Sequence, residues 1–269
     1  MIYLGPGGTP HGVSGTKKSM KYLAEEGLNA MEVQFVRGAR MKESTARDIG
    51  EEAEEHGIYL SIHGPYYINL NSKEDETIEK SKERIMKSAR LGDIMGAEVI
   101  TIHAGYYSGM SSEEATEIIG DGVVECAEKI EEEGLDVKIG LEQMGKEKSW
   151  GKLDEIEKVM DRTSAAVPVL DFAHYHARYG GKINTEEDFR ELLKKYEAIH
   201  QGPLHSHFSS IEYGEKGEKE HLNLEEHEPD FRQLASVLKE KDYDITVICE
   251  TPELDRDSLK MKEILGLEY

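Results

Sequence analysis

Short apolar runs rich in β-forming residues alternate with longer amphipathic segments along the whole chain, eight of each. The strand-like runs lie at 2–5, 30–36, 59–64, 98–105, 138–143, 166–174, 203–209 and 244–251. The helical patterns lie at about 15–27, 42–56, 74–95, 111–133, 152–162, 185–199, 228–241 and 256–265. Strict alternation of this kind is typical of a parallel sheet that closes into a barrel. We therefore expect an α/β fold, a (β/α)8 TIM barrel that occupies residues 1–269 as a single domain.

A doubly wound open sheet is the main alternative fold. Such a sheet usually carries a glycine-rich phosphate loop with the spacing G-x-G-x-x-G after an early strand. The corresponding segment, Gly5-Pro6-Gly7-Gly8, lacks that spacing, which favours the closed barrel. The long segment 209–229 shows no clear periodicity, and we expect it to be an irregular loop with a functional role.

Ionisable side chains stand at the ends of six consecutive expected strands, from the third to the eighth. They are His63, His103, Glu142, Asp171, His174, His207 and Glu250. In a barrel these strand ends converge on one face, where the active sites of the fold lie. Burying several acids and imidazoles together without a cation would be very unfavourable. The pattern therefore predicts a metal site on the C-terminal rim of the barrel.

The donor types narrow the choice of metal. Histidine and carboxylate donors without a thiolate suit Zn²⁺, Mn²⁺ or Co²⁺, and one Glu can bridge two ions. Asp171 and His174 are three residues apart and would face opposite sides of a strand, so the chain must turn after Phe172 for both to face one cavity. His221, in the segment 209–229, is a further candidate ligand, and His205 shares a strand face with His207, which would place it deeper in the barrel.

Composition limits the partners. The formal charge of −22, from 55 acidic and 33 basic residues, argues against extended, sequence-independent coating of DNA, although a metal cluster or a local basic rim can supply positive charge. The two cysteines, Cys126 and Cys249, form no disulfide or thiolate-site pattern, and we expect a cytoplasmic protein. There is neither a signal-peptide pattern nor an apolar stretch near the roughly 20 residues that a membrane span needs, so no membrane contact is expected.

At these residues the chain resembles the endonuclease IV family, zinc-dependent enzymes that cut DNA at abasic sites. The most specific piece is His63-Gly64-Pro65-Tyr66-Tyr67-Ile68-Asn69-Leu70, close to the family's His-x-x-Tyr-x-Ile-Asn-Leu. The others are His103-Ala104-Gly105, Glu142, the Asp171-x-x-His174 pair, His207-Phe208-Ser209-Ser210 and Glu250-Thr251-Pro252. The resemblance covers nearly the whole chain. It implies hydrolysis of the phosphodiester bond 5' to abasic sites, as in base excision repair.

The resemblance also implies roles for individual residues. Glu142 would bridge two zinc ions, His63 and His103 would complete the first site, and Asp171, His207 and Glu250 would complete the second. His174 and His221 would hold a third ion, and Glu142 or Glu250 would orient the nucleophile as catalytic residues. Tyr66 and Arg40 match residues that contact the substrate, duplex DNA with an abasic site. We expect the protein to act as a monomer.

Three departures from the family pattern stand out. Lys219 takes the place of an Asp ligand of the third ion, and a protonated lysine cannot bind metal, so Glu218, Glu220 or water would have to substitute. Gly5-Pro6-Gly7-Gly8 lacks the family's histidine, and Ser209-Ser210 replaces an Asn-Asp pair. Two zinc ions are therefore expected, and the third is left open.

A metal-dependent sugar isomerase or epimerase on the same barrel is the alternative function. Such enzymes hold one divalent ion with two Glu, an Asp and a His, a set matched by Glu142, Asp171, His207 and Glu250. The two Glu would then move a proton beside the carbonyl. The net charge favours this option, whereas the additional histidines favour the hydrolase, which we rank first. A barrel without catalytic activity is disfavoured by so many titratable groups on one rim.

Overall fold

The structure is a computed structural model of the chain and describes residues 1–36 and 38–267. Eight strands form one sheet in the spatial order β1-β10-β7-β6-β5-β4-β3-β2, and each ladder between them is parallel. The strands are β1 (Ile2–Pro6), β2 (Ala30–Gln34), β3 (Tyr59–His63), β4 (Val99–Ile102), β5 (Lys138–Glu142), β6 (Ala166–Asp171), β7 (Leu204–Phe208) and β10 (Ile245–Cys249).

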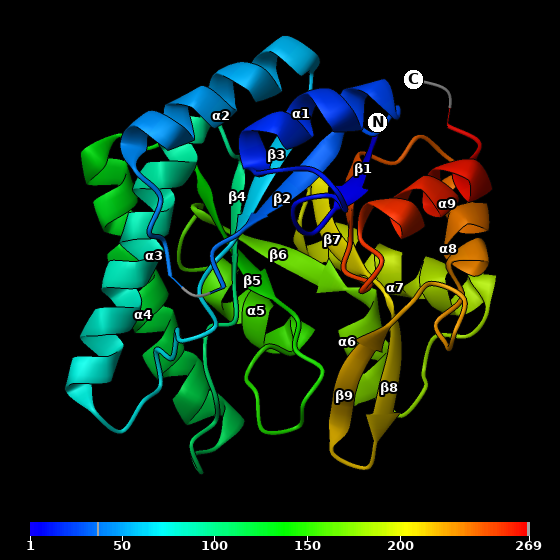
Figure 1. Ribbon diagram of the computed structural model, residues 1–269. Helices are drawn as coiled ribbons and strands as arrows, with labels where there is room; N and C mark the ends of the chain where they lie inside the picture. Colours follow the sequence, from blue (N-terminus) through cyan, green and yellow to red (C-terminus); the bar gives the residue numbers. More distant parts are fainter. Residues whose placement is uncertain (37, 268–269) are drawn as a thin grey trace.

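Helices surround this sheet on the outside (Figure 1). They are α1 (Thr16–Glu25), α2 (Glu43–His56), α3 (Asp75–Met95), α4 (Ser112–Glu133), α5 (Leu153–Met160), α6 (Phe172–Arg178), α7 (Glu186–Ile199), α8 (Phe231–Leu238) and α9 (Asp255–Leu265). The expected (β/α)8 barrel is confirmed, and most elements begin and end within a few residues of the predicted bounds.

Asn29 joins the two strands at which the barrel closes, β1 and β2. Its side chain accepts a hydrogen bond from the backbone N–H of Leu4 at 2.7 Å and donates one to the carbonyl of Ile2 at 3.2 Å. The two strands approach so closely that a Cβ on Gly5 would lie 1.6 Å from the carbonyl oxygen of Ala30. Only glycine fits at that position, since any side chain would push the seam apart.

The chain after β6 differs from the sequence-based expectation. The sixth strand was expected to continue to residue 174, but β6 ends at Asp171 and α6 begins at Phe172. The physical reason is a helix cap, because the carboxylate of Asp171 accepts a hydrogen bond from the backbone N–H of His174 at 2.6 Å. This turn brings Asp171 and His174 to the same cavity, as the spacing argument required.

The segment 209–229 also differs, because it contains a β-hairpin. Its strands are β8 (Ser210–Gly214) and β9 (Gly217–Leu222), which pair antiparallel and pack against α6 beside the barrel rim (Figure 1). The turn between them ends at Gly217, whose φ of 93° favours glycine. Charged residues on both faces of β9, Glu218, Lys219 and Glu220, hide the alternation that normally marks a hairpin in a sequence.

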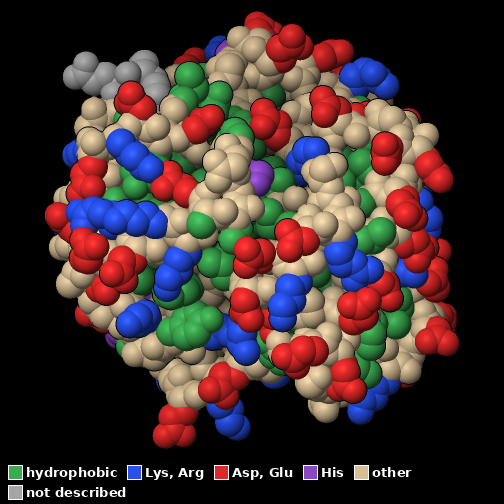
Figure 2. Space-filling view, turned by 180° about the vertical axis from the view of Figure 1, so that it is seen from behind, with side chains coloured by type: hydrophobic (Ala, Val, Ile, Leu, Met, Phe, Trp, Pro, Cys, Tyr) green, Lys and Arg blue, Asp and Glu red, His purple; other side chains and the backbone are tan. Residues whose placement is uncertain are grey.

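The core lies between the sheet and the apolar faces of the helices, and it contains both cysteines, buried and unbonded. The outer surface is highly charged, with acidic and basic side chains interspersed over the face shown in Figure 2. No helix within the described ranges combines the length and the apolar character needed to cross a bilayer.

Candidate metal centre

The carboxyl ends of the strands bring the expected ligands together around Glu142, the last residue of β5. One carboxylate oxygen of Glu142 lies 2.8 Å from Nε2 of His103 and 3.4 Å from Nε2 of His63. The other oxygen lies 3.1 Å from Nδ1 of His174 and 3.5 Å from Nδ1 of His207. Glu142 is therefore placed between two groups of donors, one on each side of its carboxylate.

Each group is compact enough to surround an ion. The donor atoms lie within 4.8 Å of one another in both groups, which are His63, His103 and Glu142, and Glu142, Asp171, His207 and Glu250. These are the two sets that the sequence resemblance implied. His103 and Glu250 stand one residue beyond β4 and β10, so strand ends and first loop residues both contribute.

Buried atoms without hydrogen-bond partners test whether this centre fits a metal. Both carboxylate oxygens of Glu142, Oδ2 of Asp171 and Nδ1 of His207 form no hydrogen bond of regular geometry among the described residues, and histidine nitrogens 2.8–3.5 Å away offer Glu142 only ion-pair contacts. Burying polar atoms without well-formed hydrogen bonds is costly, and a cation would satisfy them together. Nitrogen and oxygen donors without sulfur suit zinc and manganese. The residues present therefore fit divalent metal ions.

Backbone carbonyls orient two of the imidazoles. Nδ1 of His63 donates to the carbonyl of Gly64 at 2.9 Å, which leaves Nε2 free to face Glu142. Nδ1 of His174 donates to the carbonyl of Gln143 at 3.1 Å, which leaves Nε2 free to face the β8–β9 hairpin. Hydrogen bonds of this kind fix the ligand atom of a histidine before any ion arrives.

Burial and charge oppose one another in the metal-free chain. Burial by itself would raise the pKa of Glu142, but positive charge on His103 and contacts with His174 and His207 hold it well below its usual value. Burial raises the pKa of Asp171 to about 6, because the charge on His174 offsets only part of the penalty. Burial would lower the pKa of His63, yet the carboxylate of Glu142 raises it to about 9. The carboxyl groups of this centre therefore stay ionised only where a positive charge lies close to them.

A third corner forms where the hairpin meets α6. Nε2 of His174 lies 3.1 Å from a carboxylate oxygen of Glu218, and the rings of His174 and His221 are 5.3 Å apart. A β-bulge explains this arrangement: Glu220 pairs with Glu212 across the hairpin, but the next pair is Glu218 with Tyr213. The bulge therefore skips residue 219, so that Glu218 takes the inward side next to His221.

Lys219 consequently points away from the centre. Its ammonium group lies 2.7 Å from Glu212 on the exposed side of the hairpin. Of the substitutes considered from the sequence, Glu218 is the one that faces the candidate ligands, and one of its carboxylate oxygens has no hydrogen-bond partner within the described ranges. His221 is held by a 2.9 Å contact between its Nδ1 and the hydroxyl of Ser209.

The centre opens into a cavity of about 330 Å³. Six candidate ligands line its walls: His63, His103, His174, His221, Glu218 and Glu250. The other lining residues are Tyr66, Tyr106, Met144, Lys146, Lys148 and Ser149. Tyr66 is half exposed and lies nearly parallel to the ring of His103, 5.3 Å away. A cavity of this size fits one sugar or one nucleotide rather than a polymer.

The structure separates the two residues that were predicted to contact substrate. Tyr66 lines the cavity, whereas Arg40 lines a neighbouring hollow of about 620 Å³ with Tyr67, Arg84 and Lys87. Arg84 and Lys87 could not be selected from the sequence, because they belong to the regular helix α3 and carry no motif.

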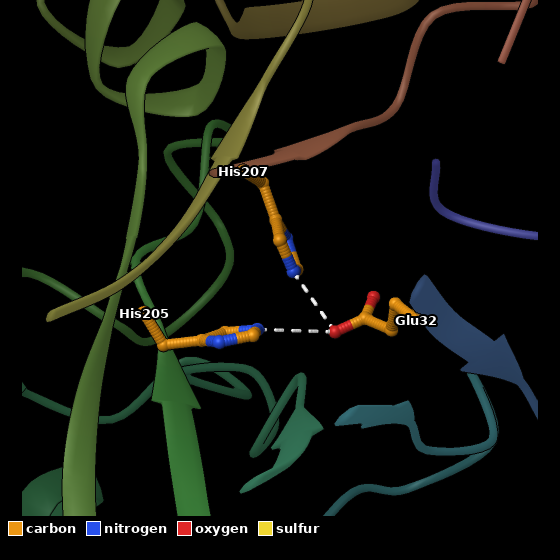
Figure 3. A group of neighbouring side chains, drawn as sticks. All are labelled: Glu32, His205 and His207. Carbon is orange, nitrogen blue, oxygen red and sulfur yellow. Dashed lines mark hydrogen bonds and ion pairs between the residues drawn. The ribbon is translucent and has the colours of Figure 1, made fainter. Parts of the chain in front are cut away.

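A polar layer beneath the centre was also missed from the sequence. Glu32 of β2 is fully buried, and one of its carboxylate oxygens lies 3.2 Å from Nε2 of His207 and 3.3 Å from Nε2 of His205 (Figure 3). An acidic residue inside the apolar run 30–36 was the available signal. His205 lies deeper in the barrel than His207, as its strand position predicted.

The fold and these side chains define a class of protein: a (β/α)8 barrel with a histidine and carboxylate centre, suited to metal ions, on its C-terminal rim. More particularly, the chain belongs to the xylose isomerase-like TIM barrel family, whose sequence profile matches residues 20–265.

Individual relatives support a link to the endonuclease IV family. An uncharacterized protein of Methanocaldococcus jannaschii, MJ0133, is 35% identical over 96% of this chain and 95% of its own length. A Halothermothrix orenii protein named probable endonuclease 4 is 27% identical over 89% of this chain and 90% of its own. The resemblance to the endonuclease IV family is thereby confirmed.

Solved structures share the fold at lower identity. Endonuclease IV from Thermus thermophilus has a TM-score of 0.74 at 19% identity and covers 97% of this chain and 98% of its own. A D-tagatose 3-epimerase-like protein has a TM-score of 0.72 at 23% identity and covers 92% and 91%. The barrel thus occurs both in a protein named as an endonuclease and in one named for sugar epimerisation.

Proposed function

We propose that this chain is a zinc-dependent hydrolase that cleaves the DNA phosphodiester bond 5' to abasic sites. The third corner is the observation that carries the proposal, because His174, Glu218 and His221 converge beside the two groups that share Glu142. An isomerase with one ion would need only the group of Glu142, Asp171, His207 and Glu250. The additional donors are accounted for by a cluster of two or three zinc ions acting on a phosphodiester.

Divalent ions at such a centre would activate water near neutral pH and offset the charge of the phosphate. Among the chain's own groups, Glu250 is best placed to orient the attacking water. Its two carboxylate oxygens lie 3.7 Å from Nδ1 of His207 and 4.0 Å from Nδ1 of His221, between the second group and the third corner. Glu142 would hold the two main groups together, and Tyr66 would offer an aromatic surface to a flipped nucleotide.

Basic side chains beside the cavity support a polyanionic substrate. Lys146 and Lys148 line the cavity itself, where Lys146 pairs with Glu218 at 3.0 Å, and Arg40, Arg84 and Lys87 line the neighbouring hollow. Contacts with a phosphate backbone normally come from such clusters, whereas a small neutral sugar needs none. We propose that duplex DNA lies across both hollows and that Arg40 contacts its backbone.

The direct test is nicking of a duplex that contains one abasic site, by the zinc-loaded chain. We expect cleavage on the 5' side, its loss after dialysis against EDTA and its recovery when zinc is added back. The absence of cleavage by the fully metallated protein would contradict the proposed activity.

Two neighbouring variants test the third corner. Glu218→Gln should slow nicking at least about tenfold, because it removes a charged donor beside His174. Lys219→Ala is the matched control, since its side chain points to the exposed Glu212, and it should leave the rate unchanged. Equal losses in the two variants would contradict the inward role of Glu218.

A sugar isomerase or epimerase is the second candidate, and one observation favours it. Glu142, Asp171, His207 and Glu250 form a complete four-donor group by themselves. In that case Glu142 and Glu250 would transfer the proton beside a ketose carbonyl. Conversion of free ketoses by the Mn²⁺-loaded protein, without nicking of abasic DNA, would replace the first proposal by this one.

A further inference from the structure

We propose that Glu32 is a positioning residue for the metal centre: it keeps a hydrogen on Nε2 of His207 and thereby makes Nδ1 the ligand atom. The inference rests on the metal centre of the proposed function and does not depend on its substrate.

The contact between Glu32 and His207 crosses the interior of the barrel. Glu32 lies on β2 and His207 on β7, and these strands are not neighbours in the sheet, since β1 and β10 separate them on the shorter side. Both side chains are fully buried, and Nε2 of His207 points directly at the carboxylate, as Figure 3 shows. A histidine held from the opposite wall has little freedom to turn its ring.

The carboxylate of Glu32 is a hydrogen-bond acceptor in each of its contacts. The oxygen that faces His207 also accepts hydrogen bonds from the hydroxyls of Ser61 at 3.0 Å and Thr101 at 3.3 Å. The other oxygen accepts one from the side-chain amide of Gln34 at 3.3 Å. A carboxylate surrounded by donors acts only as an acceptor, so Nε2 of His207 must carry the hydrogen of this bond.

The opposite nitrogen of the same ring is then the free donor atom. Nδ1 of His207 lies 3.5 Å from Glu142, 3.9 Å from Asp171 and 3.7 Å from Glu250. It has no hydrogen-bond partner in the part of the chain that the structure describes. A carboxylate behind a ligating histidine fixes its tautomer and orientation and makes the ring a stronger ligand.

Glu32, His205 and His207 are close enough to form a metal site of their own, since their donor atoms lie within 4.8 Å of one another. Hydrogen bonding argues for the positioning role instead. Both oxygens of Glu32 already accept hydrogen bonds from neutral donors, whereas both oxygens of Glu142 lack such partners among the described residues. The carboxylate of Glu32 is thus satisfied without a cation.

The first test measures the hydrogen itself. Long-range ¹H–¹⁵N spectra of the zinc-loaded protein, labelled with ¹⁵N-histidine, should show His207 with its hydrogen on Nε2. A hydrogen on Nδ1, or no zinc binding at all, would overturn the proposal. This measurement requires no variant at Glu32 and therefore does not depend on whether such a variant folds.

The second test measures zinc affinity by competition with a chromophoric chelator. Glu32→Gln should weaken one bound equivalent by about 10- to 100-fold, the usual effect of losing a carboxylate behind a ligand. Ser61→Ala is the matched control, because it removes another donor from the same oxygen and leaves His207 untouched; its affinity should stay within about threefold of wild type.

Unchanged affinity in Glu32→Gln, or equal weakening in both variants, would overturn the positioning role. A fourth zinc equivalent that disappears in Glu32→Gln would instead identify a separate metal site and would also overturn it. Since neither test uses DNA, a protein that passes both but does not nick abasic DNA would contradict only the proposed activity.

Discussion

Replacing Asp171 by Asn should change stability in opposite directions in the metal-free and the zinc-loaded protein. Asp171 is 1% exposed and lies close to Glu142 and Glu250. Asn has nearly the same shape and caps a helix as well as Asp does, so α6 should keep its first turn. The substitution therefore removes mainly a negative charge and a metal donor.

The magnitude in the metal-free protein follows from the pKa of Asp171, which burial raises from 3.8 to about 6. Each pKa unit corresponds to about 1.4 kcal/mol, so the ionised carboxylate costs the folded state up to about 3 kcal/mol. Because the folded pKa is raised, the protonated acid is favoured in the folded state, and this stability is lost as the pH rises through 6. Asp171→Asn should match wild type near pH 4 and exceed it by up to about 3 kcal/mol at pH 8.

Zinc should reverse the sign. At a free zinc concentration of about 1,000 times the dissociation constant, one bound ion stabilises the folded state by about 4.1 kcal/mol, which exceeds the roughly 3 kcal/mol gained by removing the carboxylate. Loss of the Asp171 donor weakens binding at the second group, so the variant should forfeit most of this stabilisation. With zinc at pH 8 it should therefore be less stable than wild type.

Urea unfolding followed by fluorescence provides the assay, since Trp150 is the single tryptophan and is fully buried. Asp230→Asn is the matched control, because Asp230 also caps a helix but its side chain is 45% exposed and belongs to none of the candidate ligand groups. Its stability should not respond to zinc. Equal destabilisation of Asp171→Asn with and without zinc, or a difference from wild type that does not change with pH, would refute the reasoning.

Three further variants test the site, the seam and the basic rim. Glu250→Gln should abolish nicking while the protein stays folded, and undiminished nicking would remove Glu250 from the mechanism. Asn29→Ala should lower the free energy of unfolding by about 1–3 kcal/mol, because it removes two hydrogen bonds between β1 and β2; a urea titration at constant pH measures this. The double variant Arg84→Ala, Lys87→Ala should raise KM for DNA several-fold at nearly constant kcat and should make binding less sensitive to salt. A lower kcat with unchanged salt dependence would contradict a role in backbone contact.

The barrel and most of its rim could be predicted because both follow from local patterns. Alternating strand and helix signals determine a parallel barrel, and a barrel brings all strand ends to one face. Polar residues at the ends of β3, β5 and β6 are therefore neighbours in space even though they are far apart in sequence. No contact had to be known in advance for His63 and Glu142 to be assigned to one centre.

The third corner could not be predicted in the same way, because it depends on a bulge in a hairpin. Whether Glu218 or Lys219 faces inward is decided by a shift of one residue in the pairing of β8 with β9. Glu32 was missed for a different reason. Its histidine partners lie on β7, across the interior of the barrel, and a single apolar run gives no information about what lies there.

The net charge of −22 and a polyanionic substrate are compatible because of where the charges lie. Exposed acidic runs such as Glu131-Glu132-Glu133 lie near the end of an outer helix, and salt screens charges beyond about 8 Å at physiological ionic strength. A phosphate at the rim would instead lie near Lys148, near Lys146, which pairs with Glu218 at 3.0 Å, and near the divalent ions proposed for the centre. The acidic remainder of the surface would repel DNA wherever the rim is not engaged. Under the proposed activity, such a barrel should therefore bind DNA weakly in general, and the metal centre should select the site of cleavage.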